Sequence, residues 1–506
     1  MSREQLHEDL KRYFGYSEFR QGQQEIIEDV LEAKDVLGIL PTGSGKSLCF
    51  QLPALLQSGV TVVVSPLISL MVDQVRQLKV KGVKSVTALN SFMEVKERAA
   101  VLNSLPNYRL IYLSPEILQN SRVAAKLKEL HVNLFVIDEA HCISQWGHEF
   151  RTDYLKLNEM IKELGDPPVL ALSATATPEV QQDIKIQLNR PHMVPHIYKM
   201  DKPNMSFEVE YLEDPGEKIE RIKTILSNQP APTMIYFSSR SAAEKVAEEL
   251  WLTMDQRVAF YHGGMENIDR LLVQQQFMND ELDVVCCTSA FGMGVDKPNI
   301  RRIIHYHFPG QIESFIQEIG RAGRDGKPCA SLVLHTHRDH YLPQLLIEKE
   351  LPKNEDAARV FHWFDRNERL LSDEEMLETL QLSDSQWNFI KFHLGKSGVI
   401  TRNNIEIKEN WKVIQAELLN RLQERWNYKN SKYKQMINWL FYDGCRRKML
   451  YSPFQSEVRS PQAGCCDYCG SFMKDLHIPQ KEVSRAQYSS WEARLRAIFL
   501  QEPSDG

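Results

Sequence analysis

The chain has 506 residues, of which 42% are hydrophobic and 25% charged, and its net charge is −6. This length predicts about three or four domains that each bury a core. No apolar run reaches the ~18 residues of a membrane span, and the polar start at Met1–Gln5 lacks the apolar stretch of a signal peptide. The sequence therefore predicts a protein that is neither exported nor placed in a membrane.

The cysteine content and the net charge indicate the redox environment of the protein and the way in which it could bind nucleic acid. Nine cysteines are present, and four of them gather near the end of the chain, at Cys445, Cys465, Cys466 and Cys469. This is not the spacing of a secreted disulfide framework, so we expect a reducing, cytoplasmic environment. Because the net charge is acidic, any nucleic acid must be bound by local basic patches.

The first predicted elements are helical, over residues 1–34, and short β-branched runs then alternate with amphipathic stretches. This alternation is typical of an α/β fold. The predicted strands of the first half are residues 61–64, 110–113, 134–137 and 169–172. Each strand ends at a polar motif, and in open parallel sheets ligands bind at the carboxyl ends of strands.

A glycine-rich run after the first helices predicts a phosphate site. It reads Thr42-Gly43-Ser44-Gly45-Lys46-Ser47. The glycines let backbone N–H groups face the phosphates, Lys46 neutralises the β and γ oxygens, and the Ser47 hydroxyl can bind Mg²⁺. Leu40 stands where the strict motif has its first glycine, so this run alone is only moderately specific.

The acidic box Asp138-Glu139-Ala140-His141 closes the predicted strand at 134–137. Asp138 would hold the Mg²⁺, and Glu139 would orient or deprotonate the attacking water. Together with the glycine-rich run, this box predicts a site that hydrolyses nucleoside triphosphates.

The pattern pauses at Asp201-Lys202-Pro203-Asn204. It then resumes with predicted strands at residues 234–237, 284–287 and 303–306. We therefore expect a second α/β domain.

Together these motifs resemble those of the RecQ family of superfamily 2 DNA helicases, in its short bacterial form. The resemblance covers residues 1 to about 345 and again 445–469. It implies two tandem RecA-like parallel-sheet domains, 1–200 and 201–345, with ATP and Mg²⁺ in the cleft between them. It also implies 3′ to 5′ unwinding of DNA, in repair or recombination, by an enzyme associated with the bacterial nucleoid. Single-stranded and branched DNA would be its substrates, and single-stranded-DNA-binding or recombination proteins its partners.

The resemblance assigns roles to residues on both sides of the cleft. Tyr16, Arg20 and Gln23 match the family's adenine-recognition motif. The Gln23 amide has the chemistry to pair with N6 and N7 of adenine, and Tyr16 to stack on the base. Arg321 and Arg324, which lie three residues apart, match the arginines that reach the phosphates from the second domain.

The residues expected to contact DNA, or to couple it to hydrolysis, lie in three motifs of the first domain. They are Ser65, Trp146, Phe150, Arg151, Ser173 and Thr175. Trp146 and Phe150 offer stacking faces and Arg151 offers charge, which is what single-stranded nucleic acid requires. For Ser65, Ser173 and Thr175 an ordinary strand-to-helix cap is the alternative, and for the aromatics a place in the core.

Residues 346–410 depart from the simplest family pattern and predict a winged-helix-like insertion. Two capping boxes, Ser372 with Glu375 and Ser383 with Gln386, begin short helices, and residues 356–370 would form the first helix. Residues 399–407 predict a hairpin. Such a module can bind duplex DNA, but packing against protein is an equal alternative because the second capped helix carries few basic residues.

The final four cysteines resemble the family's zinc element, and four thiolates can close a tetrahedral site. Cys445, Cys466 and Cys469 are the firmer ligands. Cys465 is the doubtful one, because here it is adjacent to Cys466, whereas the family usually separates its second and third cysteines. The predicted zinc-binding helical module covers residues 411–475, and a tail covers 476–506.

Two other functions stay open on the sequence. One is a DNA-junction binding factor with little unwinding, which would need none of Lys46, Asp138, Glu139 and Arg324. The other is an RNA-dependent ATPase, which the aromatic run before Arg151 and the cysteine cluster disfavour.

Overall fold

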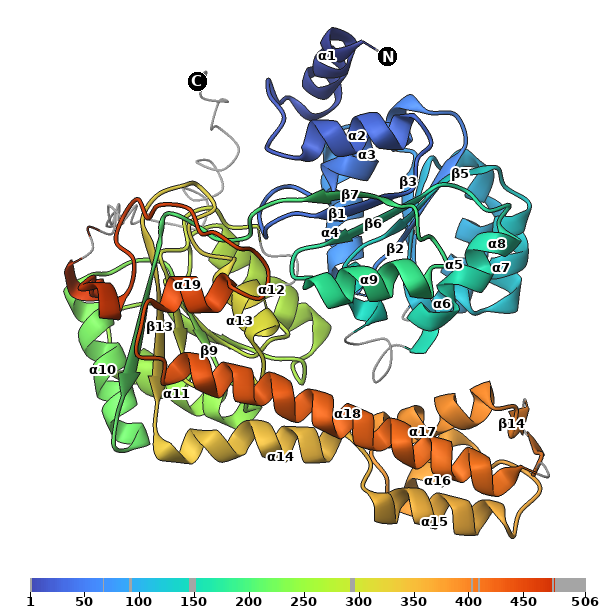
Figure 1. Ribbon diagram of the computed structural model, residues 1–506. Helices are drawn as coiled ribbons and strands as arrows, with labels where there is room; N and C mark the ends of the chain where they lie inside the picture. Colours follow the sequence, from blue (N-terminus) through green and yellow to red (C-terminus); the bar gives the residue numbers. More distant parts are fainter. Residues whose placement is uncertain are drawn as a thin grey trace.

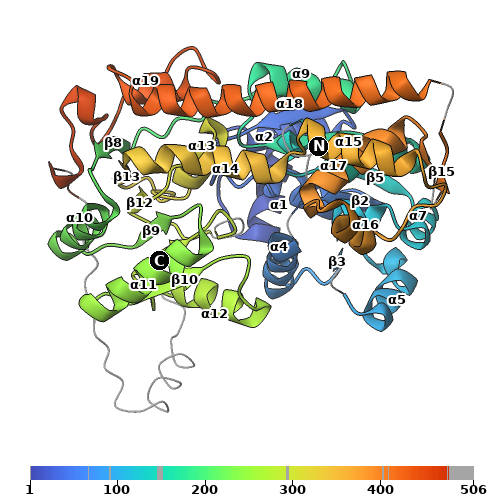
Figure 2. The same ribbon diagram turned by 90° about the horizontal axis from the view of Figure 1, so that it is seen from below.

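The computed structural model describes residues 2–66, 68–90, 93–144, 152–291, 296–401, 404–407, 410–475 and 477. Two α/β domains lie side by side, and the long helix α18 (Trp411–Leu440) runs past both of them (Figures 1 and 2). Within the described part of the chain, no helix is long and apolar enough to cross a membrane.

The first domain is built on seven parallel strands in the order β3-β4-β2-β5-β6-β1-β7. The strands are β1 (Val36–Ile39), β2 (Val60–Val64), β3 (Val86–Leu89), β4 (Leu110–Leu113), β5 (Val132–Ile137), β6 (Val169–Ser173) and β7 (Val194–Ile197). Most of them are continuous apolar runs, as parallel strands covered by helices on both faces should be. The four strands predicted in this half are confirmed.

Helices cover both faces of this sheet (Figure 1). They are α1 (Arg3–Phe14), α2 (Gln23–Leu31), α3 (Leu48–Leu56), α4 (Ile68–Val80), α5 (Val95–Asn103), α6 (Pro115–Leu118), α7 (Ser121–Lys128), α8 (Leu157–Glu163) and α9 (Pro178–Gln187). The helical stretch predicted over 1–34 is in fact two helices. Gly15 ends α1 in the left-handed conformation, with φ 75°, and residues 15–22 are not helical.

The second domain is a six-stranded parallel sheet in the order β10-β11-β9-β12-β13-β8. Its strands are β8 (Met205–Tyr211), β9 (Thr233–Tyr236), β10 (Val258–Tyr261), β11 (Val284–Cys287), β12 (Arg302–His305) and β13 (Cys329–His335). Its helices are α10 (Pro215–Asn228), α11 (Arg240–Thr253), α12 (Asn267–Met278) and α13 (Ile312–Ile319). The three strands predicted here are confirmed, so the chain has the tandem RecA-like fold.

A helical module with its own apolar core follows the second domain. Its elements are α14 (Tyr341–Glu350), α15 (Asn354–Phe364), α16 (Asp373–Leu380), α17 (Asp384–Lys396) and the antiparallel pair β14 (Ile400–Thr401) and β15 (Asn404–Ile405). Both predicted capping boxes are confirmed, because Ser372 and Ser383 accept from the backbone N–H three residues on, and Glu375 and Gln386 reach back. The helix predicted over 356–370 ends earlier, at Phe364.

Helix α18 returns the chain from this module to the second domain, where α19 (Arg446–Tyr451) and the cysteines follow (Figure 2). Lys432 of α18 forms an ion pair with Glu313 of α13. Tyr433 donates a hydrogen bond to the His340 carbonyl at 2.7 Å. The helix is therefore fixed along the second domain and carries the inserted module outward from it.

Candidate nucleotide site, cysteine cluster and interdomain cleft

The glycine-rich loop lies between β1 and α3, at the carboxyl edge of the first sheet. Gly43 and Gly45 have φ values of 81° and 74°, a region that side chains with a Cβ rarely adopt. Helix α3 begins at Leu48, directly after Lys46 and Ser47. The loop can therefore turn its N–H groups toward an anion at the start of a helix.

The N-terminal motif holds this loop from outside. The Gln23 amide donates to the carbonyls of Ser44 and Gly45, at 2.8 and 3.1 Å, and accepts from the Arg20 N–H at 2.9 Å. The Arg20 guanidinium donates to the Gly43 carbonyl at 2.7 Å. The amide predicted to read adenine is thus engaged with the phosphate loop in this structure, and it ties the motif to that loop.

Tyr16, the predicted stacking residue, lies exposed at the surface, with Lys81 Nζ 5.1 Å from its ring centroid. Its face is therefore covered by a cation in this structure. The role in binding adenine stays a prediction.

The acidic box follows β5, and it concentrates negative charge. Glu139 adopts a left-handed backbone with φ 49°, and its N–H donates to Asp138 Oδ1 at 3.0 Å. The loss of water around Asp138, together with the neighbouring Glu139 carboxylate, raises the pKa of Asp138 to about 7. A pair of crowded carboxyls fits a divalent cation, which would relieve the repulsion.

Two predicted DNA or coupling motifs are buried against this acidic box. Ser65 is 2% exposed and its hydroxyl donates to Asp138 Oδ2 at 3.5 Å. His141 Nδ1 lies 3.0 Å from Ser173 Oγ, which also accepts from the Thr175 N–H at 3.3 Å. These serines therefore stand beside the hydrolysis motif rather than on an exposed face.

The arginine loop, residues 320–324 after α13, lies directly over the glycine-rich loop of the other domain. A Cβ atom at Gly43 would lie 3.0 Å from Arg324 Cγ, and one at Gly320 would overlap the Thr42 hydroxyl. Arg324 forms an ion pair with Asp296 at 2.6 Å. The structure therefore brings the predicted halves of the site together across the interdomain cleft.

Among the described residues, the buried polar atoms without a hydrogen-bond partner include two from the loops of this site. They are Ser44 Oγ and Arg321 Nε, one from each domain. Buried polar atoms are normally hydrogen-bonded, so these two atoms call for a further partner such as a ligand. A nucleotide phosphate is such a ligand, because its oxygens accept hydrogen bonds from hydroxyl and guanidinium groups.

All four C-terminal cysteines, Cys465 included, converge on one point. Their Sγ atoms lie within 4.8 Å of one another, and Cys445 Sγ is 3.5 Å from Cys465 Sγ. Zinc bound to four thiolates at ~2.3 Å places the sulfurs ~3.8 Å apart, so the donor set and its spacing fit the metal. The doubt that the sequence raised about Cys465 has no support in this geometry.

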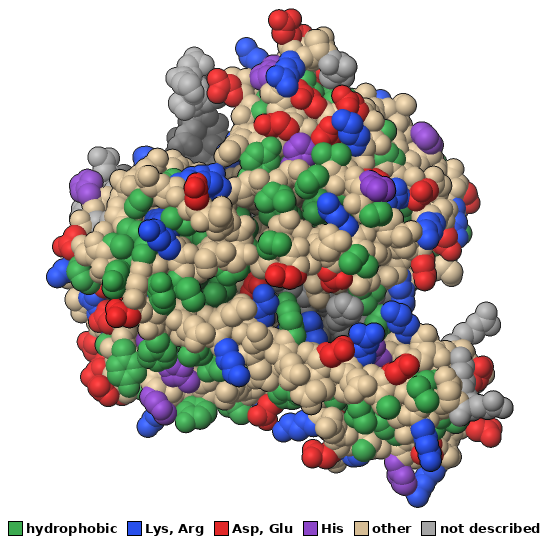
Figure 3. Space-filling model, viewed as in Figure 1, with side chains coloured by type: hydrophobic (Ala, Val, Ile, Leu, Met, Phe, Trp, Pro, Cys, Tyr) green, Lys and Arg blue, Asp and Glu red, His purple; other side chains and the backbone are tan. Residues whose placement is uncertain are grey.

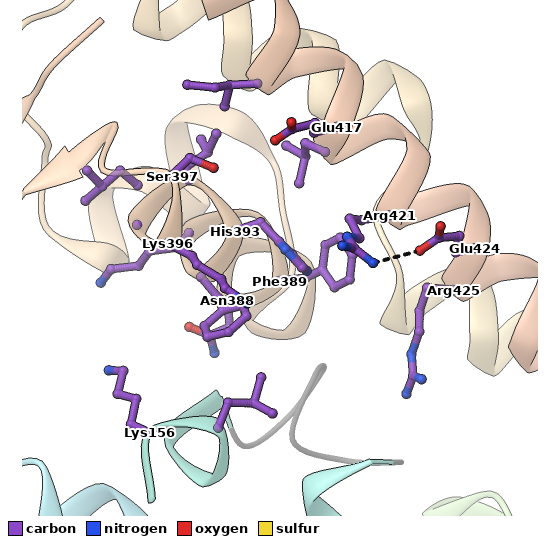
Figure 4. Close-up of a pocket in the computed structure, with 18 of the residues that line it drawn as sticks. Lys156, Asn388, Phe389, His393, Lys396, Ser397, Glu417, Arg421, Glu424 and Arg425 are labelled. Atoms are coloured by element: carbon purple, nitrogen blue, oxygen red, sulfur yellow. Dashed lines mark hydrogen bonds and ion pairs between the residues drawn. The ribbon is translucent and has the colours of Figure 1, made fainter. Parts of the chain in front are cut away.

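A cleft of about 1080 Å³ separates the inserted module from the first domain. Its walls are α17 and α18 on one side and α8 and α9 on the other, with Lys156 and Arg425 directed toward the space between them (Figure 4). Phe392 and Lys396 line it from α17, and Tyr428 from α18. Figure 3 shows Lys and Arg side chains at the edges of the hollow between these parts.

Trp146, Phe150 and Arg151 lie outside the described residues, so their predicted contacts remain predictions. Ser144, just before this run, lines the cleft. The sequence also missed residues that organise the site. In the sequence Lys202 is only part of a predicted domain boundary. Arg447 is only one of the basic residues after Cys445.

Residues 20–184 match the DEAD/DEAH box helicase family, and residues 217–326 match the helicase conserved C-terminal domain. Over 502 residues the chain is 42% identical to the probable ATP-dependent DNA helicase RecS of Bacillus subtilis, covering 98% of each protein. It is 41% identical over 350 residues to the ATP-dependent DNA helicase RecQ of Haemophilus influenzae, covering 68% of this chain and 56% of that one.

Among solved structures, the Mycobacterium smegmatis helicase Lhr bound to single-stranded DNA and AMP-PNP aligns with a TM-score of 0.55 at 20% identity. The alignment covers 70% of this chain and 53% of that one, and it shows the shared helicase fold. Fold and site thus define a superfamily 2 helicase. The identity to RecS and RecQ places the chain in the RecQ family of ATP-dependent DNA helicases.

Asp138→Asn is expected to raise the melting temperature of the nucleotide-free protein at about pH 8 more than at about pH 5. A carboxyl whose folded pKa is raised from 3.8 to about 7 binds more protons when folded, so its contribution to stability falls as the pH rises across that range. Near pH 5 the wild-type group is largely protonated and resembles the amide. Calorimetry without Mg²⁺ or nucleotide measures the difference.

The exposed Asp255 supplies the control, since Asp255→Asn is expected to shift the melting temperature by the same small amount at both pH values. An effect of Asp138→Asn that does not change with pH would contradict the burial of an ionisable carboxyl at this position.

Proposed function

We propose that the chain couples ATP hydrolysis to movement along single-stranded DNA and unwinds duplex DNA in the 3′ to 5′ direction. The observation that carries the proposal is the contact between the glycine-rich loop and the arginine loop, with Arg324 over Gly43 and Gly320 against Thr42. Such a contact can make ATP hydrolysis depend on the relative position of the two domains. A protein that moves along DNA requires this dependence. The likeness to RecQ proteins supports DNA as the track.

In this proposal each side of the nucleotide cleft, between the two α/β domains, has its own role. Lys46 and the loop N–H groups bind the phosphates, and Ser47 and Asp138 are the ligands for Mg²⁺, which neutralises phosphate charge when bound. Glu139 orients or deprotonates the attacking water, and Arg321 and Arg324 stabilise the charge that develops on the transferred phosphoryl group.

The second task is to connect DNA to this chemistry. Trp146, Phe150 and Arg151 are the proposed strand contacts, and His141 with Ser173 and Thr175 connects the acidic box to the next motif. Because Ser144 lines the cleft beneath the inserted module, a strand held by that run would reach Phe392, Tyr428 and Lys396. Aromatic faces with nearby cations suit unpaired bases and phosphates.

We also propose that the cysteine cluster holds one structural zinc ion, with all four cysteines as ligands. Four thiolates without an open position are typical of structural rather than catalytic zinc. The site would stabilise the segment that packs on β8, where Cys466 forms an isolated bridge to Phe207. The free cysteines, which suit a reducing environment, support a place in the cytoplasm, and the likeness to DNA helicases supports a place on DNA.

Lys46→Ala is expected to lower ATP turnover by ~100-fold or more, because the phosphates lose a preorganised charge, while single-stranded DNA binding changes little. Steady-state hydrolysis and fluorescence anisotropy measure the two properties. Lys162→Ala, an exposed lysine of α8, is the control and is expected to behave as the wild type.

The wild-type assay also separates the alternatives. Stimulation by single-stranded DNA but not RNA, with displacement of strands from 3′-tailed duplexes, supports the proposal. Stimulation by RNA alone would favour the RNA-dependent ATPase, and DNA binding without turnover would favour a junction-binding factor.

Lys396→Glu and Phe392→Ala are expected to weaken binding of single-stranded DNA, since stacking on an aromatic is worth ~1–3 kcal/mol per base and a phosphate contact is lost or reversed. Only strands long enough to enter the cleft should show the loss. Anisotropy titrations with a short and a long oligonucleotide test this.

The matched control is Lys412→Glu, the same charge change on an exposed residue of α18 that does not line the cleft. If Lys396→Glu and Lys412→Glu weaken binding equally, the cleft contributes only general charge. The proposed path beneath the module would then be wrong.

The purified protein is expected to carry about one zinc per chain. Serine at any one of Cys445, Cys465, Cys466 and Cys469 should lower both zinc content and thermal stability, because metal binding contributes to folding. Metal analysis and melting curves measure these effects. Cys286→Ser, in the buried strand β11, is the control that should keep its metal, and full metal retention in Cys465→Ser would remove that residue from the site.

A further inference from the structure

Lys202 lies in the linker between the two domains, residues 198–204 between β7 and β8. Its side chain reaches the backbone of the arginine loop. Its Nζ donates to the Gly320 carbonyl at 2.5 Å and to the Ala322 carbonyl at 2.7 Å. These two carbonyls flank Arg321, and Arg324 follows two residues later. One side chain therefore fixes the main chain on both sides of Arg321, within the loop that lies against the phosphate loop.

The chemistry of this contact is only partly that of an ordinary helix cap. Helix α13 ends at Ile319, and a lysine that binds the free carbonyls at a helix C-terminus is favourable. This lysine, however, is enclosed by protein beside two arginines. The loss of water, together with Arg324 and Arg321, lowers the pKa of Lys202 to about 7. Lys202 is therefore the third cation in this part of the second domain, beside Arg321 and Arg324.

The linker is itself held by residues of the segment predicted as the zinc-binding module, residues 411–475, which we call the cysteine module. Arg447, which is fully buried, donates to the Lys202 carbonyl at 2.6 Å and to the Met205 carbonyl. Its guanidinium also lies over the Phe207 ring, 5.2 Å from the centroid. Asn204 adds a second link, because its amide donates to the Gly323 carbonyl at 2.9 Å. The cysteine module thus holds the Lys202 main chain, while the Lys202 and Asn204 side chains hold the arginine loop.

We propose that Lys202 is a positioning residue for ATP hydrolysis: it sets the backbone of residues 320–324 so that Arg321 and Arg324 meet the nucleotide, and Arg447 of the cysteine module holds Lys202 in place. The inference rests on the proposed function, since it concerns the rate of that hydrolysis. It assigns a catalytic consequence to a segment whose sequence indicates only a domain boundary.

The test compares Lys202→Met with Lys199→Met, an exposed lysine of the same linker that pairs with Glu457 at 3.5 Å. Lys202→Met is expected to lower kcat by roughly tenfold or more, with KM for ATP changed by less than about threefold, because transition-state rather than ground-state contacts are lost. Lys199→Met is expected to match the wild type. Lys202→Arg, which keeps paired donors, should retain more kcat than Lys202→Met.

A double-variant cycle distinguishes positioning from plain structural support. If Lys202 acts through the arginines, adding Lys202→Met to Arg324→Ala should cost less than about a further twofold in kcat. Independent, multiplying losses, or an unchanged kcat in Lys202→Met, would overturn the proposal. Should Lys202→Met fail to fold, Lys202→Gln compared with Lys202→Arg, alone and with Arg324→Ala, carries the same test.

The wild-type protein keeps this experiment separate from the broader proposal. A wild type that does not hydrolyse ATP would contradict the proposed function itself. A wild type that hydrolyses ATP, with Lys202→Met equally active, would contradict only the positioning role of Lys202.

Discussion

One short linker is hydrogen-bonded both to the arginine loop and to the cysteine module, and the proposed placement of the arginines depends on it. Residues from the cysteine module hold the linker along its length. Asp201 accepts from the Gln455 amide at 2.8 Å and from the Arg459 N–H at 2.7 Å, and the Gln462 N–H donates to the Pro203 carbonyl at 2.8 Å. Because arginines in such sites act through exact placement of charge, a misplacement of an ångström or so can remove most of their effect. The cysteine module therefore holds the linker between the two domains in one conformation.

The two walls of the nucleotide cleft carry opposite charges, and charged groups on both walls are shielded from water. On one wall the pKa of Asp138 is raised to about 7 by loss of water and by Glu139. On the other, loss of water lowers the pKa of Arg324. A phosphate with its divalent cation offers an opposite charge to each wall at once. Binding and domain closure are therefore expected to favour each other, because the ligand interacts more strongly with the closed arrangement.

The sequence predicted most of the central strands, although it did not name β1 and β13, which are also buried along their whole length. Parallel strands that are covered on both faces are short continuous apolar runs, and β2, β4, β6 and β11 are buried along their whole length. The edge strand β7 was missed, because it alternates between half-buried and exposed residues and contains Pro195. The edge strand β8 loses its burial toward Tyr211 in the same way, and its partner includes Cys466 from far along the chain. Local pattern carries little information where a strand's environment is supplied by distant segments.

The site shows the same division between local and distant information. Motif spacing predicted Lys46 and Asp138, and the family resemblance predicted Arg324, because each belongs to a motif within a single loop. Neither could show that the Gln23 amide is engaged by the phosphate loop, or that Lys202 meets the arginine loop, since those contacts join segments that only the tertiary fold brings together.

The inserted module illustrates what such contacts decide. The sequence left duplex binding and protein packing as equal alternatives for its second capped helix, α17. In the structure Lys391 pairs with Asp373 at 2.7 Å, within the module, and it lines the cleft toward the first domain together with Phe392 and Lys396. Phe392 is half-buried there and is not part of the module's apolar core. Helix α17 keeps Lys391 in an ion pair within the module, and its Phe392 and Lys396 lie along the cleft. We therefore expect this helix to meet a single strand that leaves the helicase core rather than a duplex.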